Sequence, residues 1–132
     1  MSVEDNKRLV REFCAHFGTS NADGLIDSMT EDATWWVNGK PHLSSSAGTK
    51  TRAEAGTMLR NMLNAYVDGL DMIVTKMIGE GDIVAAEARS YATAKSGKIY
   101  ENEYLFLFQF RNEKISGVKE YTDLMHVEET FG

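Results

Sequence analysis

The stretch "IYENEYLFLFQFRNEKISGVKEYT", residues 99–122, decides the fold. It contains two long strand patterns on either side of "RNEK", residues 111–114, which has the composition of a turn. Strands near twelve residues are long for a small domain, and long strands must twist and curl. One face of the resulting sheet becomes concave, so the sequence predicts a curved sheet that can enclose a cavity.

The last of these strands leaves open which acidic side chain points into the protein. Neither of its alternating faces is cleanly apolar, because Glu120 shares one face with Val118 while Asp123 shares the other with Tyr121. Since side chains in a strand alternate with a period of two, pairing with the neighbouring strands decides the question.

The composition indicates one packed domain over residues 1–132. The chain is 42% hydrophobic and 26% charged, which allows a core and argues against wholesale disorder. A net charge of −6 without a basic stripe argues against nucleic acid as a partner. The charged N-terminus lacks an apolar signal segment, and no apolar run approaches the ~20 residues of a membrane span. We therefore expect a cytoplasmic protein with no membrane partner.

Three helices are predicted before the main group of strands. Ser2 with Asp5, and Thr51 with Glu54, form capping-box patterns that begin the first and third helices, and Asn21 can cap a short second one. Apolar residues recur at helical spacing after each of these positions. The helices are placed to cover the concave face of the sheet.

The strands follow an α-α-β-α-β-β-β-β order. "ATWWV", residues 33–37, is rich in strand-forming residues and precedes a long irregular loop over residues 38–50. Turn compositions then separate four antiparallel strand patterns at 70–78, 83–95, 99–110 and from 115 onward. The predicted fold class is therefore α+β, a cone built from a curved, mostly antiparallel sheet.

The turns allow the strand register to be predicted. If "SGK" closes one hairpin, Lys95 lies near Ile99, and if "NEK" closes the next, Arg111 lies near Ile115. Two rows then cross the three strands on one face: Ser90, Tyr104 and Thr122 in the first, and Ala88, Phe106 and Glu120 in the second. Tyr104 is diagonal to Glu120, within ~7–8 Å.

This face is the better inner face because it carries small and apolar residues and only one charge. Its members are Val84, Ala86, Ala88, Ser90, Ala92, Asn102, Tyr104, Phe106, Phe108 and Glu120. The small side chains leave volume between sheet and helices, which either forms a cavity or is filled by Met58 and Met62. Asp123 goes to the outer face, where we expect it to pair with Tyr91 or Arg89.

Three sequence segments resemble a known family. They are "LIDSMTEDATWWVNG" at residues 25–39, "GTKTRAEA" at residues 48–55 and, after a long hairpin, "EKISGVKEYTDL" at residues 113–124. They are similar to the nuclear transport factor 2-like superfamily, in its SnoaL-like, ketosteroid isomerase-like and limonene epoxide hydrolase-like branch. The resemblance spans nearly the whole chain and implies the cone fold more firmly than any reaction.

The resemblance can be followed residue by residue. The ketosteroid isomerase positions for the tyrosine donor, the basic aspartate and the protonated aspartic acid fall on Phe13, Val37 and Phe106. That isomerase chemistry is therefore not implied. The epoxide hydrolase arginine and aspartate positions fall near Ala88 and Ser90, and its last-strand aspartate falls on Glu120. Glu120 is the one carboxylate of that set that remains.

The candidate catalytic residues are Glu120, as an acid or base, and Tyr104, as a hydrogen-bond donor to it or to a substrate oxygen. Burial would raise the pKa of Glu120 toward a useful range. The expected substrate-binding residues are Trp35, Asn102, Ser90, Ala88, Phe106 and Met62. A purely structural explanation stays open for each residue. The Glu120 carboxyl, for example, could simply be hydrogen-bonded to Tyr104, Trp35 or water.

The leading functional hypothesis is a cofactor-free enzyme that transfers protons on an apolar oxygenated molecule. The resemblance implies polyketide-, terpenoid- or steroid-like compounds, with isomerisation, cyclisation, dehydration or hydration as the reaction. The alternatives are a non-catalytic ligand-binding or accessory module and a structural dimer with a filled cone. His16, His42 and His126 lack metal-ligand spacing, so no metal site is expected.

The outer face of the sheet predicts a two-fold homodimer. It mixes apolar and charged side chains without helices to cover them, and it includes Arg89, Leu105, Leu107 and Tyr121. An ordinary solvated sheet face is the alternative.

Overall fold

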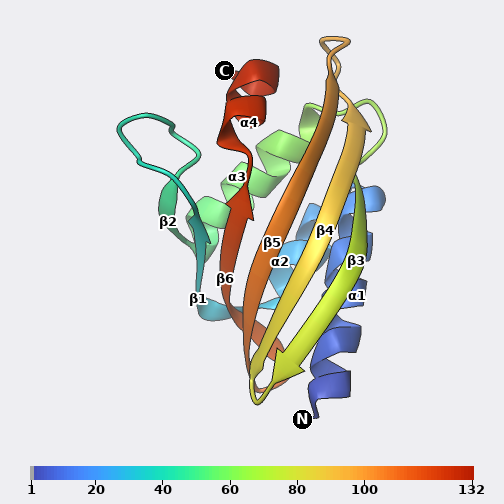
Figure 1. The fold of residues 1–132 in the computed structure, drawn as a ribbon, viewed down its shortest axis with the longest axis vertical. Coiled ribbons are helices and arrows are strands. Elements are labelled where there is room, and N and C mark those ends of the chain that lie inside the picture. The colour runs from blue at the N-terminus through green and yellow to red at the C-terminus, as the bar shows by residue number, and fades with distance from the viewer. Residues whose placement is uncertain (1) are drawn as a thin grey trace.

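The computed structural model describes residues 2–132 (Figure 1). Four helices and six strands follow one another as α1 (Val3–Gly18), α2 (Ala22–Asp27), β1 (Met29–Val37), β2 (Gly48–Thr51), α3 (Arg52–Asn64), β3 (Asp71–Glu80), β4 (Ile83–Thr93), β5 (Ile99–Arg111), β6 (Lys114–Thr122) and α4 (Leu124–Phe131). The expected capping boxes begin α1 and α3, and Asn21 caps α2. The predicted α+β class is confirmed, while two elements, β2 and α4, are additional to the predicted order.

The strands form one sheet in the order β2-β1-β6-β5-β4-β3. Neighbouring strands are antiparallel except β1 and β6, which run parallel. Figure 1 shows the long strands β3 to β6 curving together, with α1, α2 and α3 against one face of the sheet. The short α4 sits at the C-terminal end of β6, beside the first residues of β5. No helix within residues 2–132 has the length and apolar character that crossing a membrane requires.

The face assignment of the long strands is confirmed, although one register is shifted. Tyr104 lies opposite Thr122, and Phe106 lies opposite Glu120, as predicted. On the other side, however, Tyr104 lies opposite Ala88 rather than Ser90, and Phe106 lies opposite Ala86. The hairpin loop is longer than expected, because Thr93 pairs with Ile99 and Ala94 N donates to Lys98 O. A shift of two residues leaves every side chain on its predicted face.

A β-bulge changes the lower end of β6. The register between β5 and β6 slips between Gln109 and Phe110, so that Phe110 pairs with Ile115. Ile115, which simple alternation puts on the outer face with Tyr121, is therefore turned inward and is fully buried. The bulge does not reach Glu120, which keeps its inward position.

The small side chains of β4 are matched by large ones on β5. Ala92 lies opposite Tyr100, Ala88 opposite Tyr104 and Ala86 opposite Phe106, and all of these residues are buried. Each aromatic ring takes up the space that the facing alanine leaves. The volume expected above Ala88 and Ser90 is therefore filled by side chains of the neighbouring strand, and the pocket lies elsewhere.

Candidate functional site

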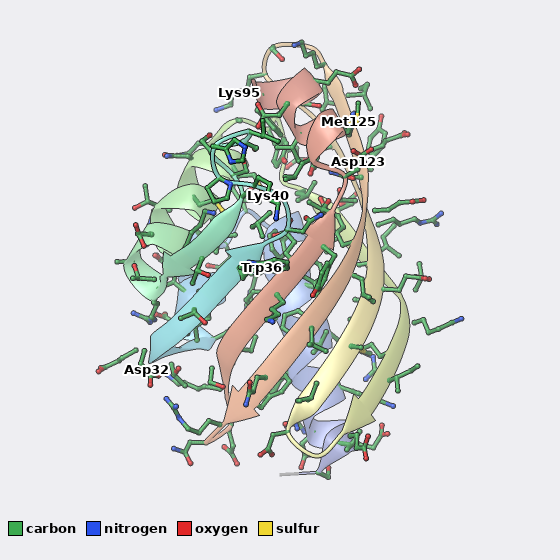
Figure 2. All side chains as sticks on the ribbon, turned by 60° about the vertical axis from the view of Figure 1, so that its left-hand side comes forward. Asp32, Trp36, Lys40, Lys95, Asp123 and Met125 are labelled. Carbon is green, nitrogen blue, oxygen red and sulfur yellow. The ribbon has the colours of Figure 1, made fainter. Side chains whose placement is uncertain are left out.

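Glu120 is held on the inner face by β1 and β5. It lies opposite Val37 on β1 and opposite Phe106 on β5. Its Oε1 accepts a 2.9 Å hydrogen bond from the indole nitrogen of Trp35. Trp35 is fully buried, whereas Trp36 turns outward onto Tyr121, at a ring-centroid distance of 5.1 Å. Figure 2 shows Trp36 on the side of the sheet away from the helices. The alternation of the two tryptophans thus gives Glu120 a fixed donor.

The surroundings of Glu120 favour its protonated form. Burial raises the pKa of Glu120 from its usual 4.5 to about 7, against smaller opposing effects of the Trp35 hydrogen bond and the Lys50 charge. A carboxyl with a pKa near 7 exchanges its proton readily at neutral pH, which is the property that a general acid or base requires.

Glu120 opens into a pocket of about 610 Å³ between the sheet, α3 and α4. The side of α3 contributes Met58 and Met62, and α4 contributes Leu124, Val127 and Phe131. The remaining lining residues are mostly polar, and they include two further charged side chains and the apolar Val37 and Ala65: Val37, Ser45, Ser46, Lys50, Glu54, Thr57, Asn61, Ala65, Tyr100 and Thr122. A pocket that combines apolar side chains of α3 and α4 with polar groups suits a small organic molecule that carries oxygen.

Lys50 is a pocket residue that sequence reasoning missed. It lies on β2, directly opposite Trp35, so that its side chain reaches the inner face beside Glu120. Its Nζ donates a 2.6 Å hydrogen bond to the carbonyl oxygen of Ser46. Burial lowers the pKa of Lys50, and the negative charges of Glu120 and Glu54 oppose that effect. The polar segment "GTKT" gave no strand signal strong enough to place this side chain.

A buried hydrogen-bond network lies next to the pocket. The hydroxyls of Ser90 and Tyr104 are 2.7 Å apart, and Tyr104 donates to the hydroxyl oxygen of Tyr100 at 3.0 Å. The Asn102 side-chain amide also donates to Tyr100, at 2.9 Å, and to the main-chain carbonyl of Asp123, at 3.2 Å. Tyr100 is the member of this network that lines the pocket, and burial raises its pKa to about 12, so it remains protonated.

Tyr66 adds a second phenol to this region. Its ring stacks on Tyr100 at a centroid distance of 6.0 Å, and burial raises its pKa. Within residues 2–132 its buried hydroxyl has no hydrogen-bond partner. Neither Tyr66 nor Tyr100 was expected at the site, because the apolar helical spacing around Tyr66 predicted only a core position for it.

The structure separates the predicted site residues into three groups. Glu120 and Met62 line the pocket, and Trp35 supports Glu120 from the core. Tyr104, Ser90 and Asn102 belong to the buried network, so Tyr104 bonds to Ser90 and Tyr100 rather than to Glu120. Ala88 and Phe106 are buried in the sheet's inner layer and make no part of the pocket wall.

Asp123 differs from its expected role. Its carboxylate accepts from the main-chain nitrogens of Met125 and His126, at 3.0 and 3.3 Å, and so caps α4 instead of pairing with Tyr91 or Arg89. Figure 2 shows Asp123 where β6 gives way to α4. The N-cap role matters to the site because α4 forms one wall of the pocket.

His126 attaches α4 to β5. Its Nε2 accepts a 3.0 Å hydrogen bond from the main-chain nitrogen of Glu101, and its ring stacks on Tyr100 at a centroid distance of 5.3 Å. Phe131 also contacts Tyr100, at 5.3 Å between centroids. In residues 2–132 no group of three or more His, Cys, Asp or Glu side chains is arranged to hold a metal ion.

Comparison with known proteins identifies first the fold class and then the family. The fold is similar to an NTF2-like protein of unknown function from Burkholderia pseudomallei, with 18% identity and a TM-score of 0.80 over 98% of this chain and 97% of that one. A family profile described as the SnoaL-like domain matches residues 10–118. The chain therefore belongs to the SnoaL-like family, as the sequence resemblance implied, and its fold is that of the NTF2-like structure.

Two further solved structures share the fold. TerC, co-crystallised with polyporic acid, is 18% identical, with a TM-score of 0.79 over 95% of this chain and 96% of that one. AusH from Aspergillus nidulans is 12% identical, with a TM-score of 0.81 over 92% of this chain and 86% of that one. Among curated proteins, none matches the chain.

Proposed function

We propose that this protein binds a small, largely apolar oxygenated molecule and uses Glu120 to transfer a proton on it. The single observation that carries the proposal is a carboxyl with a pKa of about 7 that faces a pocket with an apolar wall. Such a group is half protonated at neutral pH, so it can give a proton to one atom of a substrate and take one from another. The reaction class is isomerisation, cyclisation, dehydration or hydration without a cofactor.

Tyr100 is the proposed hydrogen-bond donor to the substrate oxygen. Its hydroxyl oxygen already accepts from Tyr104 and Asn102, and no acceptor for its own proton is found among residues 2–132. That proton is therefore left for an oxygen in the pocket. Two incoming hydrogen bonds also make the Tyr100 O–H a better donor, because they stabilise the negative charge that donation leaves on its oxygen.

The polyporic acid in the related TerC structure supports an aromatic, oxygenated class of ligand for this chain. Such a ring would lie against Met58, Met62 and Leu124, with its oxygen toward Tyr100 and Glu120. A flat apolar body with one or two polar atoms fits this division of the pocket.

A non-catalytic binding module is the alternative. It is favoured because the other positions that are catalytic in the resembled enzymes hold residues that lack those catalytic groups. Phe13 and Phe106 are fully buried core residues, Val37 is an apolar residue of the pocket wall, and Ser90 is held in the internal network. Glu120 would then only fix the orientation of a bound molecule.

Deuterium uptake separates these two functions. Apolar ligands are first identified by native mass spectrometry, with 2-tetralone as an added probe, and are then incubated in D₂O with the wild type or with Glu120→Gln. Proton-transfer chemistry predicts deuterium uptake or chemical change that the glutamine variant loses by a factor of about 10²–10⁴. Ligands recovered unchanged from the wild type would leave the binding module as the function.

We also propose a homodimer through the outer face of the sheet. Leu105, Leu107 and Tyr121 are partly exposed there despite their apolar character, and Trp36 lies beside Tyr121. The neighbouring Arg89 and Glu103 lie opposite each other across β4 and β5, which adds a polar rim. Apolar residues inside a charged border are the usual composition of a protein interface.

A further inference from the structure

Lys50 is unusually well fixed for a lysine on an edge strand. β2 is only four residues long, Gly48–Thr51, and lies at the edge of the sheet. The Lys50 side chain is half-buried, and its Nζ is held 2.6 Å from the Ser46 carbonyl oxygen. The ammonium group therefore has a defined position in the wall of the pocket, where most surface lysines are mobile and fully hydrated.

The two carboxylates near Lys50 are engaged in different ways. Glu54 accepts from the main-chain nitrogen of Thr51 at 2.9 Å, as part of the α3 capping box. Glu120 is held by Trp35 and has a pKa near 7, so at neutral pH about half of the molecules carry no charge there. Burial lowers the pKa of Lys50, and the charges of Glu120 and Glu54 oppose that effect. An amine and a protonatable carboxyl that line the same pocket can together carry out carbonyl chemistry.

We propose that Lys50 condenses with the carbonyl group of an aldehyde or ketone held in the pocket, and that Glu120 moves the protons of this reaction. This deepens the proposed function and rests on it, because it assigns the substrate class as carbonyl compounds and adds a covalent intermediate to the same pocket.

The reaction balances with groups that the pocket holds. The lone pair of Nζ forms a bond to the carbonyl carbon while the oxygen takes up the proton that the amine loses, which gives a carbinolamine. Protonated Glu120 then donates to the hydroxyl, the carbon–oxygen bond breaks, and water and a protonated imine result. The Glu120 carboxylate next removes a proton from the carbon beside the imine, which gives an enamine and restores the carboxylic acid. Lys50 and Glu120 need only face the same carbonyl group, and both line the pocket.

Reductive trapping tests the covalent step. The whole protein at pH 7 is treated with 2-naphthaldehyde and cyanoborohydride, which reduces an imine to a stable amine, and the modified lysines are located by peptide mass spectrometry. We expect Lys50 to be modified at least about tenfold faster than the exposed Lys40 and Lys114 of the same molecules. Glu120→Gln should slow modification at Lys50 and leave Lys40 unaffected. Modification of Lys50 no faster than of Lys114 overturns the proposal.

A second measurement separates this proposal from the proposed function. Lys50→Arg keeps the positive charge but removes the nucleophile, and circular dichroism is used to check that the variant folds. The rate of deuterium uptake into 2-tetralone is compared with that of Glu120→Gln. Loss in both variants supports the imine. Loss in Glu120→Gln alone overturns the imine and leaves the proposed proton transfer intact. Uptake that neither variant changes contradicts both.

Discussion

Replacing Glu120 with glutamine should remove a pH dependence from the free energy of unfolding. Below pH 4.5 the carboxyl is protonated in the folded and unfolded chains, so it imposes no penalty for charge burial. Between pH 4.5 and about 7 the unfolded chain loses its proton first, and the folded state loses stability as pH rises. Above pH 7 both states are ionised, and the loss is complete.

The size of this effect follows from the pKa difference. One pKa unit corresponds to about 1.4 kcal/mol, so a pKa raised from 4.5 to about 7 corresponds to an upper limit of roughly 3 kcal/mol. Glu120 is half-buried and keeps some contact with water, which reduces the expected loss to about 2 kcal/mol. Glutamine does not titrate, and its side-chain oxygen still accepts from Trp35.

Urea unfolding of both proteins between pH 4 and pH 8.5 measures the effect. The free energy of unfolding of the wild type, minus that of Glu120→Gln, should fall by about 2 kcal/mol over this range. Glu31→Gln, at an exposed position of β1, is the control for loss of one carboxylate. If the free energies of unfolding of wild type and Glu120→Gln change in parallel with pH, the pKa of Glu120 is not raised in the folded state.

Three further substitutions test other parts of the site and surface. Trp35→Phe removes the hydrogen-bond donor to Glu120 and should raise the pKa of that carboxyl further, as measured by NMR titration. An unchanged pKa would show that this hydrogen bond does not stabilise the ionised carboxylate. Tyr100→Phe should weaken binding of 2-tetralone about fivefold, through loss of one hydrogen bond, and equal affinity in a fluorescence titration would contradict the donor role. Leu105→Lys should shift the sedimentation coefficient toward that of a monomer, whereas Leu43→Lys in an exposed loop should not; a monomeric wild type would disprove the dimer.

The face of each long strand could be predicted because side-chain alternation tolerates a two-residue error. The predicted pairing of Ser90 with Tyr104 was wrong, because residues 94–98 form a longer loop with Gly97 at a φ of 91°. Glu120 nevertheless stayed on the inner face. A one-residue error has the opposite result, as the bulge that buries Ile115 demonstrates.

The pocket could not be predicted because its walls come from elements with weak local signals. β2 is short and polar, so Lys50 appeared to lie in a loop. A signal for α4 was present, since Asp123 precedes Leu124, Val127 and Phe131 at helical spacing, but the preceding strand pattern obscured it. Whether the volume beside Ala88 is open or filled could not be decided from the sequence either, since the volume of an alanine says nothing about the ring that faces it.

The proposed function depends above all on Glu120 exchanging its proton near neutral pH inside the pocket. The most direct measurement is a ¹³C NMR titration of protein labelled at the glutamate side-chain carboxyls, with the Glu120 resonance identified by its absence from Glu120→Gln. We expect a titration midpoint of about 7. A midpoint near the ordinary 4.5 would mean that Glu120 is simply an ionised carboxylate at neutral pH, and it would contradict both the proton transfer and the proposed part of Glu120 in imine formation at Lys50.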